Sequence, residues 1–243
     1  MTQRHCLFCG STSLSKEHIL GRWMVPHLPG SGGFTHTYAK ENGLPVATWF
    51  NAVLDLKVKR VCRECNSGWM QELDQRLAPL LIPMLNGHAV CFGPNEIVLM
   101  ATWAAKIQAL YQYAIRPPRA VPPPRLGAIC KGRPSEGTFV WLASYSGKRS
   151  AWVSSRQLRF QRPSAPEDYQ FGELFTLAIG HLVVQVLVGP NWPGTNFRPE
   201  VPTPASPLIL PVWPGIDSGE WPPATQLSDE ELDRYARSFV NDG

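Results

Sequence analysis

The apolar residues of the first half of the chain recur at helical spacing in two stretches. The first begins at Asn66 and predicts a helix to about Ala78, beyond which Pro79 and Pro83 are expected to kink or restart it. The second predicts a helix from Pro94 to about Ile115. Apolar residues cover most of the circumference of this second helix, so we expect it to be central and buried.

The other apolar patterns favour strands. Leu54 to Val61 alternates apolar and basic residues, which predicts a half-buried strand with a cationic face. Short apolar runs in the second half predict a small antiparallel sheet, with turns at Ser146-Gly147 and Gly180-His181. These runs are Thr138 to Tyr145, Ala151 to Phe160, Phe175 to Ile179 and Leu182 to Val188. The expected fold is therefore α+β, with a small antiparallel β-sheet packed on a long central helix.

Turn-forming residues and prolines indicate the connections. Residues 27–50 are expected to form an inserted loop, residues 116–134 an extended basic connection, and residues 190–223 an extended surface segment. Ser228 to Glu231 is a capping box that predicts a short C-terminal helix to about Phe239. We expect two regions: a module at 1–90 that includes the inserted loop, and a region at 91–243 that holds the buried helix and the sheet.

Two Cys-x-x-Cys pairs change this picture, because they supply the four thiolates that a structural Zn²⁺ requires. They are Cys6 with Cys9, and Cys62 with Cys65. Redox motifs and unrelated core thiols are the alternatives, and the repeated spacing favours zinc over both. Cys91 and Cys130 have no such spacing, and we expect them to be ordinary core thiols in a reducing cytoplasm.

Polar residues beside the two pairs are candidates for chemistry. Glu17 and His18 lie between the pairs, and Asn66 directly follows Cys65. Imidazole is the side chain best matched to proton transfer at neutral pH, so His18 is the candidate general base. Glu17 and Asn66 offer hard oxygen ligands, which favour Mg²⁺ or Mn²⁺ over a second Zn²⁺. Each also has a purely structural interpretation, as a solvated pair or as a helix-terminal residue.

The order Cys-x-x-Cys, acidic-His-Ile, basic strand, Cys-x-x-Cys-Asn and helix resembles the zinc-braced HNH, or ββα-metal, endonucleases. The stretch Cys65 to Met70 is similar to the Cys-Asn-x-Gly-Trp-Met signature of a bacterial and phage group, and the Cys-Asn order to phage resolvases of the endonuclease VII type. The resemblance covers about the first third of the chain. It implies a treble-clef zinc unit and metal-dependent hydrolysis of phosphodiester bonds in DNA rather than RNA, in phage or bacterial defence or mobile-element processing.

The resemblance also implies roles for single residues. Catalysis would involve His18, Glu17 and Asn66, the last two as ligands of Mg²⁺ or Mn²⁺. Lys57, Lys59 and Arg60 would contact backbone phosphates. Two departures keep a second interpretation open, a zinc-braced nucleic-acid-binding module without activity. Lys57 stands where the family often has Asn, and Trp69 and Met70 stand where many relatives have another polar ligand.

Composition and motif content limit the classes of protein to which the chain could belong. The chain of 243 residues carries a net charge of +4, which suits a nucleic-acid partner without requiring one. Its N-terminus has no apolar signal-peptide region, and its most apolar window, Leu174 to Val188, is shorter than the roughly 20 residues of a membrane span, so a soluble, cytoplasmic protein is expected. Phosphate-binding loop, serine-hydrolase elbow and dinucleotide fingerprint are missing from the sequence. A third interpretation makes the C-terminal region a scaffold for a protein partner or a homo-oligomer, through exposed Trp192, Trp213 and Trp221.

Overall fold

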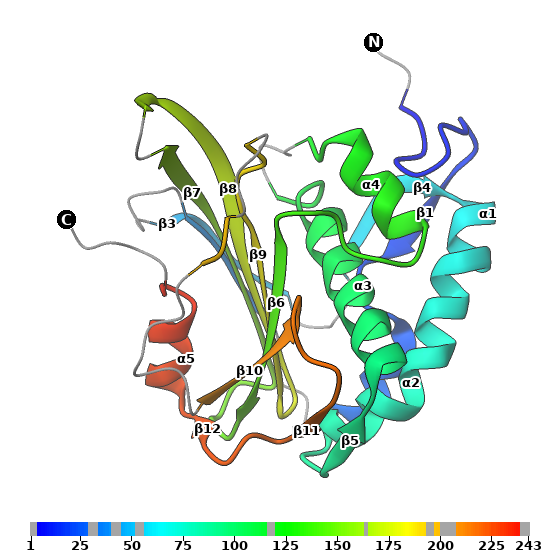
Figure 1. Cartoon of the computed structure of the whole chain (residues 1–243). Coiled ribbons are helices and arrows are strands. Elements are labelled where there is room, and N and C mark those ends of the chain that lie inside the picture. Colours follow the sequence, from blue (N-terminus) through cyan, green and yellow to red (C-terminus); the bar gives the residue numbers. More distant parts are fainter. Residues whose placement is uncertain are drawn as a thin grey trace.

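The fold is a mixed α+β arrangement in which one large sheet has helices on both faces (Figure 1). The computed structural model describes residues 4–28, 34–39, 45–51, 56–115, 120–162, 165–192, 197–199 and 208–238. Among these residues no helix is both long and apolar enough to cross a membrane.

The large sheet joins segments from both ends of the chain. Its strand order is β10-β6-β9-β8-β7-β2-β3, with β12 also paired to β6. The β2–β7 and β12–β6 pairings are parallel and the others are antiparallel. The strands are β2 (Phe34–Ala39), β3 (Pro45–Asn51), β6 (Thr138–Tyr145), β7 (Ala151–Arg162), β8 (Ala165–Ile179), β9 (Leu182–Val188), β10 (Ile209–Trp213) and β12 (Gln226–Leu227).

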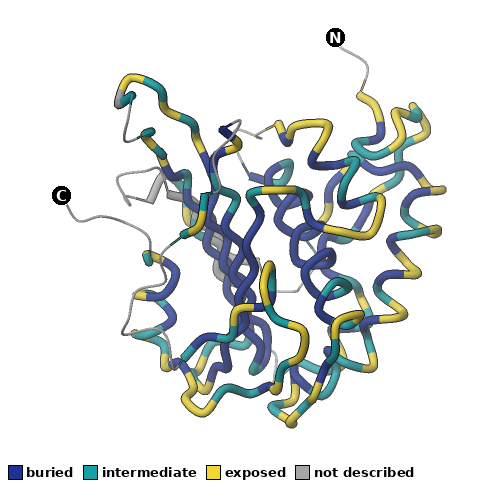
Figure 2. The backbone as a smooth tube through the Cα atoms, viewed as in Figure 1, coloured by how far each residue is buried: buried dark blue, intermediate teal, exposed yellow. Residues whose placement is uncertain are grey.

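Both faces of this sheet are covered, which explains why its strands are almost continuously apolar. Alternate residues of β9 belong to different core clusters: Val184 and Val186 pack toward α3 (Pro94–Tyr111), and Val183 and Leu187 toward α5 (Asp229–Tyr235). Figure 2 shows β6, β9 and α3 as continuously buried parts of the backbone. α3 lies between the sheet and α2 (Gln71–Leu85), and α5 lies on the opposite face (Figure 1).

The N-terminal part forms a two-stranded ribbon followed by a helical segment. β1 (Leu14–His18) pairs antiparallel with β4 (Lys57–Cys62), with a bulge between Ser15 and Glu17. A 3-10 turn, η1 (Arg22–His27), follows β1. After β4 the chain runs through α1 (Arg63–Cys65) and a π-helical turn, η2 (Asn66–Met70), into α2. Gly68 leaves helical geometry at φ −94° and ψ −118°, so Asn66 is set apart from the regular helix by this kink.

A second small ribbon and a tight turn attach α2 to the rest of the molecule. β5 (Val90–Phe92) pairs with β11 (Gly219–Trp221). The backbone amide of His181, in the turn between β8 and β9, donates to the Leu85 carbonyl at the end of α2, with an N–O distance of 3.1 Å. Gly180 in this turn has φ +55°, and a Cβ there would lie 2.4 Å from the Leu85 oxygen. Glycine is therefore required at this contact.

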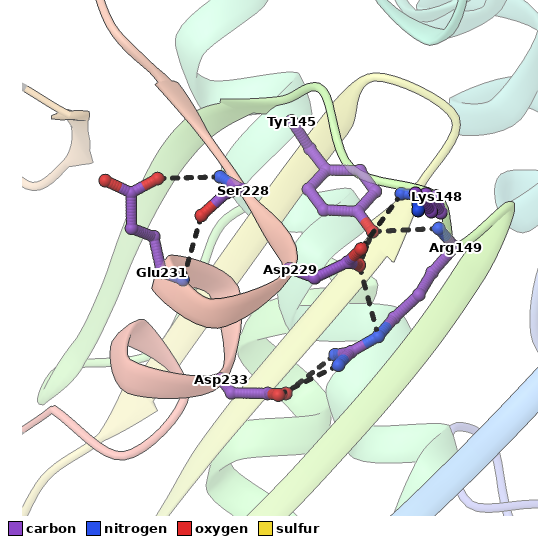
Figure 3. A network of polar contacts seen from close by, with 7 residues as sticks. All are labelled: Tyr145, Lys148, Arg149, Ser228, Asp229, Glu231 and Asp233. Atoms are coloured by element: carbon purple, nitrogen blue, oxygen red, sulfur yellow. Dashed lines mark hydrogen bonds and ion pairs between the residues drawn. The ribbon is translucent and has the colours of Figure 1, made fainter.

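Helix α5 is held on the sheet by a polar network (Figure 3). Ser228 and Glu231 form the predicted capping box, which is confirmed. The Arg149 guanidinium makes two hydrogen bonds to Asp233, with N–O distances of 2.6 and 2.8 Å. Asp229 accepts hydrogen bonds from the Tyr145 hydroxyl and the Lys148 amide. The predicted end of this helix at Phe239 lies outside the described residues.

Several predictions about elements are wrong. The predicted loop at 27–50 contains β2 and β3, which extend the sheet, so the sheet is larger than predicted and mixed rather than purely antiparallel. The predicted extended connection at 116–134 contains α4 (Pro123–Cys130), while residues 116–119 lie outside the described part. Helix α2 continues through Pro79 and Pro83 to Leu85.

Some expected environments are also wrong. Trp192 and Trp221 are buried, with 8% and 1% of their surface exposed, so neither is an exposed contact point for a partner. Cys91 is exposed and Cys130 is half-buried, so they are not core thiols. The division into regions 1–90 and 91–243 stays a prediction. One core cluster nevertheless contains residues of both, including Cys62 and Val184.

Candidate metal centre

The four cysteines of the two Cys-x-x-Cys pairs lie together. The sulfur atoms of Cys6, Cys9, Cys62 and Cys65 are all within 4.8 Å of one another. Cys9 is exposed and the other three are buried. Four thiolates at this spacing suit the tetrahedral sulfur coordination of a structural metal ion such as zinc. The cluster could therefore hold one metal ion.

Tight turns bring the sulfurs into position. The Gly10 amide donates to the Cys6 carbonyl, and Gly10 has φ +78°, which closes the turn after Cys9. The Leu7 amide donates to the Arg60 carbonyl and so joins this turn to β4. Cys62 caps α1, and its sulfur accepts from the Cys65 amide at 3.4 Å.

The environment of the thiols separates their pKa values. Burial raises the pKa of Cys62 to about 11, and burial also raises the pKa of Cys65. At Cys6 burial acts to raise the pKa, but backbone hydrogen bonds at Cys62, Phe8 and Cys9 lower it to about 7. A bound metal ion would need all four sulfurs deprotonated, so binding would release protons from the buried thiols.

A polar cluster lies beside the cysteines. Glu17 projects from β1 and makes a side-chain hydrogen bond with Asn66, which follows Cys65 directly. Asp74, in the first turn of α2, is close enough to act electrostatically on Glu17. Asp74 Oδ2 lies 3.1 Å from the position that a Cβ of Gly21 would occupy. The chain that follows β1 therefore passes close to Asp74. Three oxygen-bearing side chains thus meet next to the candidate metal centre.

Lys106 brings a positive charge to this cluster from α3. Its ammonium group is 2.6 Å from the nearer Asp74 oxygen, and the Lys106 side chain is only 2% exposed. Burial raises the pKa of Glu17 to about 7, and Asp74 acts in the same direction, whereas Lys106 and the Asn66 hydrogen bond oppose it. The cluster therefore combines two carboxyl groups, one amide and one ammonium group in a largely water-excluded place.

His18 lies on the opposite face of the β1–β4 ribbon from Glu17. It is paired with Lys57, and Glu17 with Val58, in the antiparallel register of β1 and β4. Paired residues share a face and neighbouring residues alternate, so His18 lies on the Lys57 face and Glu17 on the buried Val58 face. Lys57 and Lys59 are both exposed on the first face. The ribbon therefore places His18 with the two lysines, and Glu17 with Asn66.

Arg60 is separated from the two lysines. Its guanidinium carbon lies 4.9 Å from the centre of the Tyr113 ring, and Arg60 is half-buried. The three basic residues predicted to contact phosphates thus do not form one surface. Lys57 and Lys59 lie on a common exposed face, whereas Arg60 packs toward the end of α3.

The signature residues after Asn66 are structural. Phe8 of the first Cys-x-x-Cys turn packs edge-on against Trp69, with ring centres 4.9 Å apart, and Met70 is 1% exposed. Neither residue supplies a ligand, and both fix the π-helical turn against the cysteine cluster.

Asp74 and Lys106 were not predicted as site residues. Asp74 follows Asn66 by eight residues, so a search of the polar residues farther along the same helical segment finds it. Lys106 gives a different signal, because a lysine in a stretch of α3 whose other residues are mostly apolar needs a buried partner, although the sequence does not identify Asp74 as that partner.

Comparison of the chain with family models, with curated proteins and with solved structures finds no match.

Proposed function

We propose that this chain is a metal-dependent endonuclease of the HNH type that hydrolyses phosphodiester bonds in DNA. The observation that carries the proposal is the contact between Glu17 and Asn66. These residues are 49 positions apart in the sequence and meet beside four clustered cysteines. A ββα order of elements, β1, β4 and the α1–α2 helical segment, brings them together.

The donor chemistry fits two kinds of metal ion. Four sulfurs suit zinc, which in this proposal braces the turn between β4 and α1. The oxygens of Glu17, Asn66 and Asp74 suit Mg²⁺ or Mn²⁺, which accept few protein ligands and complete their shell with water and phosphate oxygens. Such a cation, when bound, would stabilise the charge that develops on a scissile phosphate.

The protein side chains have separate tasks in this proposal. His18, which is half-buried at the end of β1, takes a proton from the attacking water. Lys57 and Lys59, on the same face as His18, bind backbone phosphates of the DNA. Glu17 and His18 lie on opposite faces, so the phosphate is expected to bind across the edge of the ribbon, where it can reach both.

One observation favours a second function, a metal-braced nucleic-acid-binding module that does not cleave. Lys106 already contributes an ammonium group to the cluster in which the proposal requires a divalent cation. Protein ammonium groups can neutralise buried carboxylates without any metal ion. In this alternative, Lys57 and Lys59 still bind DNA, and Glu17, Asp74 and Lys106 only stabilise the fold.

The deciding experiment measures nicking of supercoiled plasmid DNA by the wild-type chain and by His18→Ala, each with Mn²⁺ or Mg²⁺. We expect the wild type to nick, and His18→Ala to lose at least about a hundredfold in rate, the usual contribution of a general base. Metal analysis should give the same zinc content for both proteins, which shows that the cysteine cluster is intact.

The paired variant Lys57→Ala/Lys59→Ala separates binding from cleavage. It should weaken DNA binding and reduce the salt dependence of the binding constant, because fewer phosphates are neutralised. Cleavage by His18→Ala at the wild-type rate would contradict the role of His18. DNA binding without nicking by the wild type, at any divalent metal concentration tested, would favour the second function.

A further inference from the structure

A large cavity lies away from the cysteine cluster, between α3, α4 and the middle of β7 and β8. Its volume is about 940 Å³, which falls within the range of small-molecule sites. Its lining includes Gln108 and Gln112 of α3, Arg125 of α4 and Glu173 of β8. These side chains are at most 9% exposed, so polar groups that are normally hydrated line the interior of the protein.

Some of the polar groups in this lining are matched with one another. The Arg125 guanidinium donates to the Gln108 side-chain oxygen. The Gln112 amide nitrogen donates to the Ser155 hydroxyl at 3.4 Å, and that hydroxyl donates to Glu173. These bonds fix the orientation of both glutamine side chains.

Other polar atoms of the same side chains have no hydrogen-bond partner among the described residues. Among the described residues, Gln108 Nε2, Gln112 Oε1 and Arg125 Nε are buried and have no hydrogen-bond partner. Unmatched buried polar groups are costly and rare in folded proteins. Two of these atoms are donors and one is an acceptor, so a ligand that matches them carries acceptors together with an N–H or O–H donor.

The charges in the cavity oppose a strongly ionic ligand. Arg125 and Glu173 attract each other, and the rim residues Arg133 and Glu136 also carry opposite charges. A phosphate would be repelled by Glu173 inside the cavity and by Glu136 at its rim, and a polyamine would be repelled by Arg125 and Arg133. A neutral polar molecule meets no such penalty.

Aromatic side chains stand at the border of the cavity. Phe171 is 54% exposed, one of the few large apolar side chains so exposed among the described residues, and Trp213 is half-buried. Exposed aromatic rings beside a polar pocket suit a flat ring that stacks on them.

We propose that the cavity bounded by Gln108, Gln112, Arg125 and Phe171 is a binding site for a nucleobase, presented by a nucleoside or an unpaired nucleotide. Nucleobases are neutral and flat, and they carry ring acceptors next to N–H donors. Their edges suit the amide and guanidinium groups of the lining side chains Gln108, Gln112 and Arg125, and their faces suit stacking on Phe171. This proposal does not depend on nuclease activity, because it concerns a separate cavity and requires no metal ion.

Isothermal titration calorimetry of the full chain tests the site. The probes are guanosine, adenosine, cytidine and uridine, with ribose and L-glutamine as comparison compounds. We expect at least one nucleoside to bind with one site per chain, and ribose not to bind. Gln112→Leu should weaken that binding by at least about tenfold, because it removes the acceptor for the base. Phe171→Ala should weaken it by about tenfold through loss of stacking.

Val25→Ala is the control, since Val25 is an exposed apolar residue that does not line the cavity. It should bind the nucleoside like the wild type. Phe171 is exposed, so its replacement leaves the core intact and keeps the test valid even where Gln112→Leu fails to fold. Absence of nucleoside binding, binding of L-glutamine instead, or wild-type affinity in Phe171→Ala would each overturn the proposal.

Discussion

At the scale of single residues, Lys106 determines the charge balance of the polar cluster beside the cysteines. A buried ammonium group is stable only when it is paired, and Lys106 has its partner in Asp74 at 2.6 Å. Glu17 is a second carboxyl group close to the same cation. One ammonium group therefore lies close to two acidic side chains and cannot fully neutralise both. Burial raises the pKa of Glu17 to about 7, and the charge of Lys106 opposes this rise only in part.

Lys106→Met tests whether the ammonium group replaces a divalent cation. The variant leaves the buried carboxyl groups without a cation, so we expect a loss of about 3–5 kcal/mol in the free energy of unfolding. Mn²⁺ should restore part of this loss, because the oxygens of Glu17, Asn66 and Asp74 can then coordinate it. Urea denaturation with and without Mn²⁺ measures both effects.

Lys59→Met is the control, because Lys59 is an exposed lysine on the other face of the ribbon. It should change the free energy of unfolding by less than about 0.5 kcal/mol, with no effect of Mn²⁺. If Lys106→Met is as stable as this control, the ion pair with Asp74 is not what holds the cluster together.

At the scale of elements, charged contacts hold α5 on the sheet. It has only seven residues, too few to be stable alone, and it covers the sheet with buried Leu232 and Tyr235. Arg149 and Tyr145 bind its acidic first turns, as Figure 3 shows. Both acidic residues, Asp229 and Asp233, must be charged for this network to persist.

Acid is therefore expected to weaken the attachment of α5. The Tyr145 hydroxyl bond, together with the Lys148 amide and the charge of Arg149, lowers the pKa of Asp229. A carboxyl group with a lowered pKa in the folded state adds stability above its unfolded pKa, near 4, and this stability is lost as the pH falls through the folded value. The difference in melting temperature between the wild type and Asp229→Asn should be positive at neutral pH and shrink toward zero in acid.

The control for this comparison is Asp217→Asn, at an exposed position outside the network. Its melting temperature should stay close to that of the wild type at every pH. A difference between wild type and Asp229→Asn that persists unchanged at about pH 3, below the ordinary pKa of aspartate, would show that charge at Asp229 is not involved.

Elements were predictable where the sequence pattern and the local environment agree. β6 and β9 have the predicted bounds, because both are apolar runs ended by turn residues and buried on both faces. Helix α2 continues through Pro79, which is exposed, and Pro83, which is half-buried, because neither proline points into the core. Leu73, Leu77 and Leu81 pack the other face of the helix against the core. A pattern of prolines alone does not show which face they occupy.

Partners distant in sequence were the least predictable. Glycines and prolines around β2 and β3 predict a loop there, whereas the place of both strands in the sheet depends on the pairing of β2 with β7, more than 100 residues away. The cysteine cluster was predictable because its spacing is local within each pair. The pairing of Lys106 with Asp74 was not, because it depends on how α3 packs against α2, and the apolar neighbours of Lys106 indicate only that a buried partner is needed.

At the scale of the whole molecule, the cysteine cluster is part of the main core. Cys6, Cys62 and Cys65 belong to the same cluster of buried residues as Trp103 of α3 and Val186 of β9. The contact between Gly180 and Leu85 adds a second connection between α2 and the sheet. Loss of order at the cysteines should therefore spread through α3 to the sheet.

Treatment with a chelator, which would remove a metal ion held by the four cysteines, tests this coupling and the predicted division at residue 90. Because one core joins both regions, we expect a single calorimetric transition that moves to lower temperature, with faster amide exchange in α3 and β9 as well as in β4. Cys62→Ser should reproduce the shift. Cys91→Ser, at an exposed cysteine outside the cluster, should not. Two transitions, with the one for the sheet unchanged after chelation, would instead show that residues 1–90 unfold as an independent unit and that the shared core does not couple the two regions.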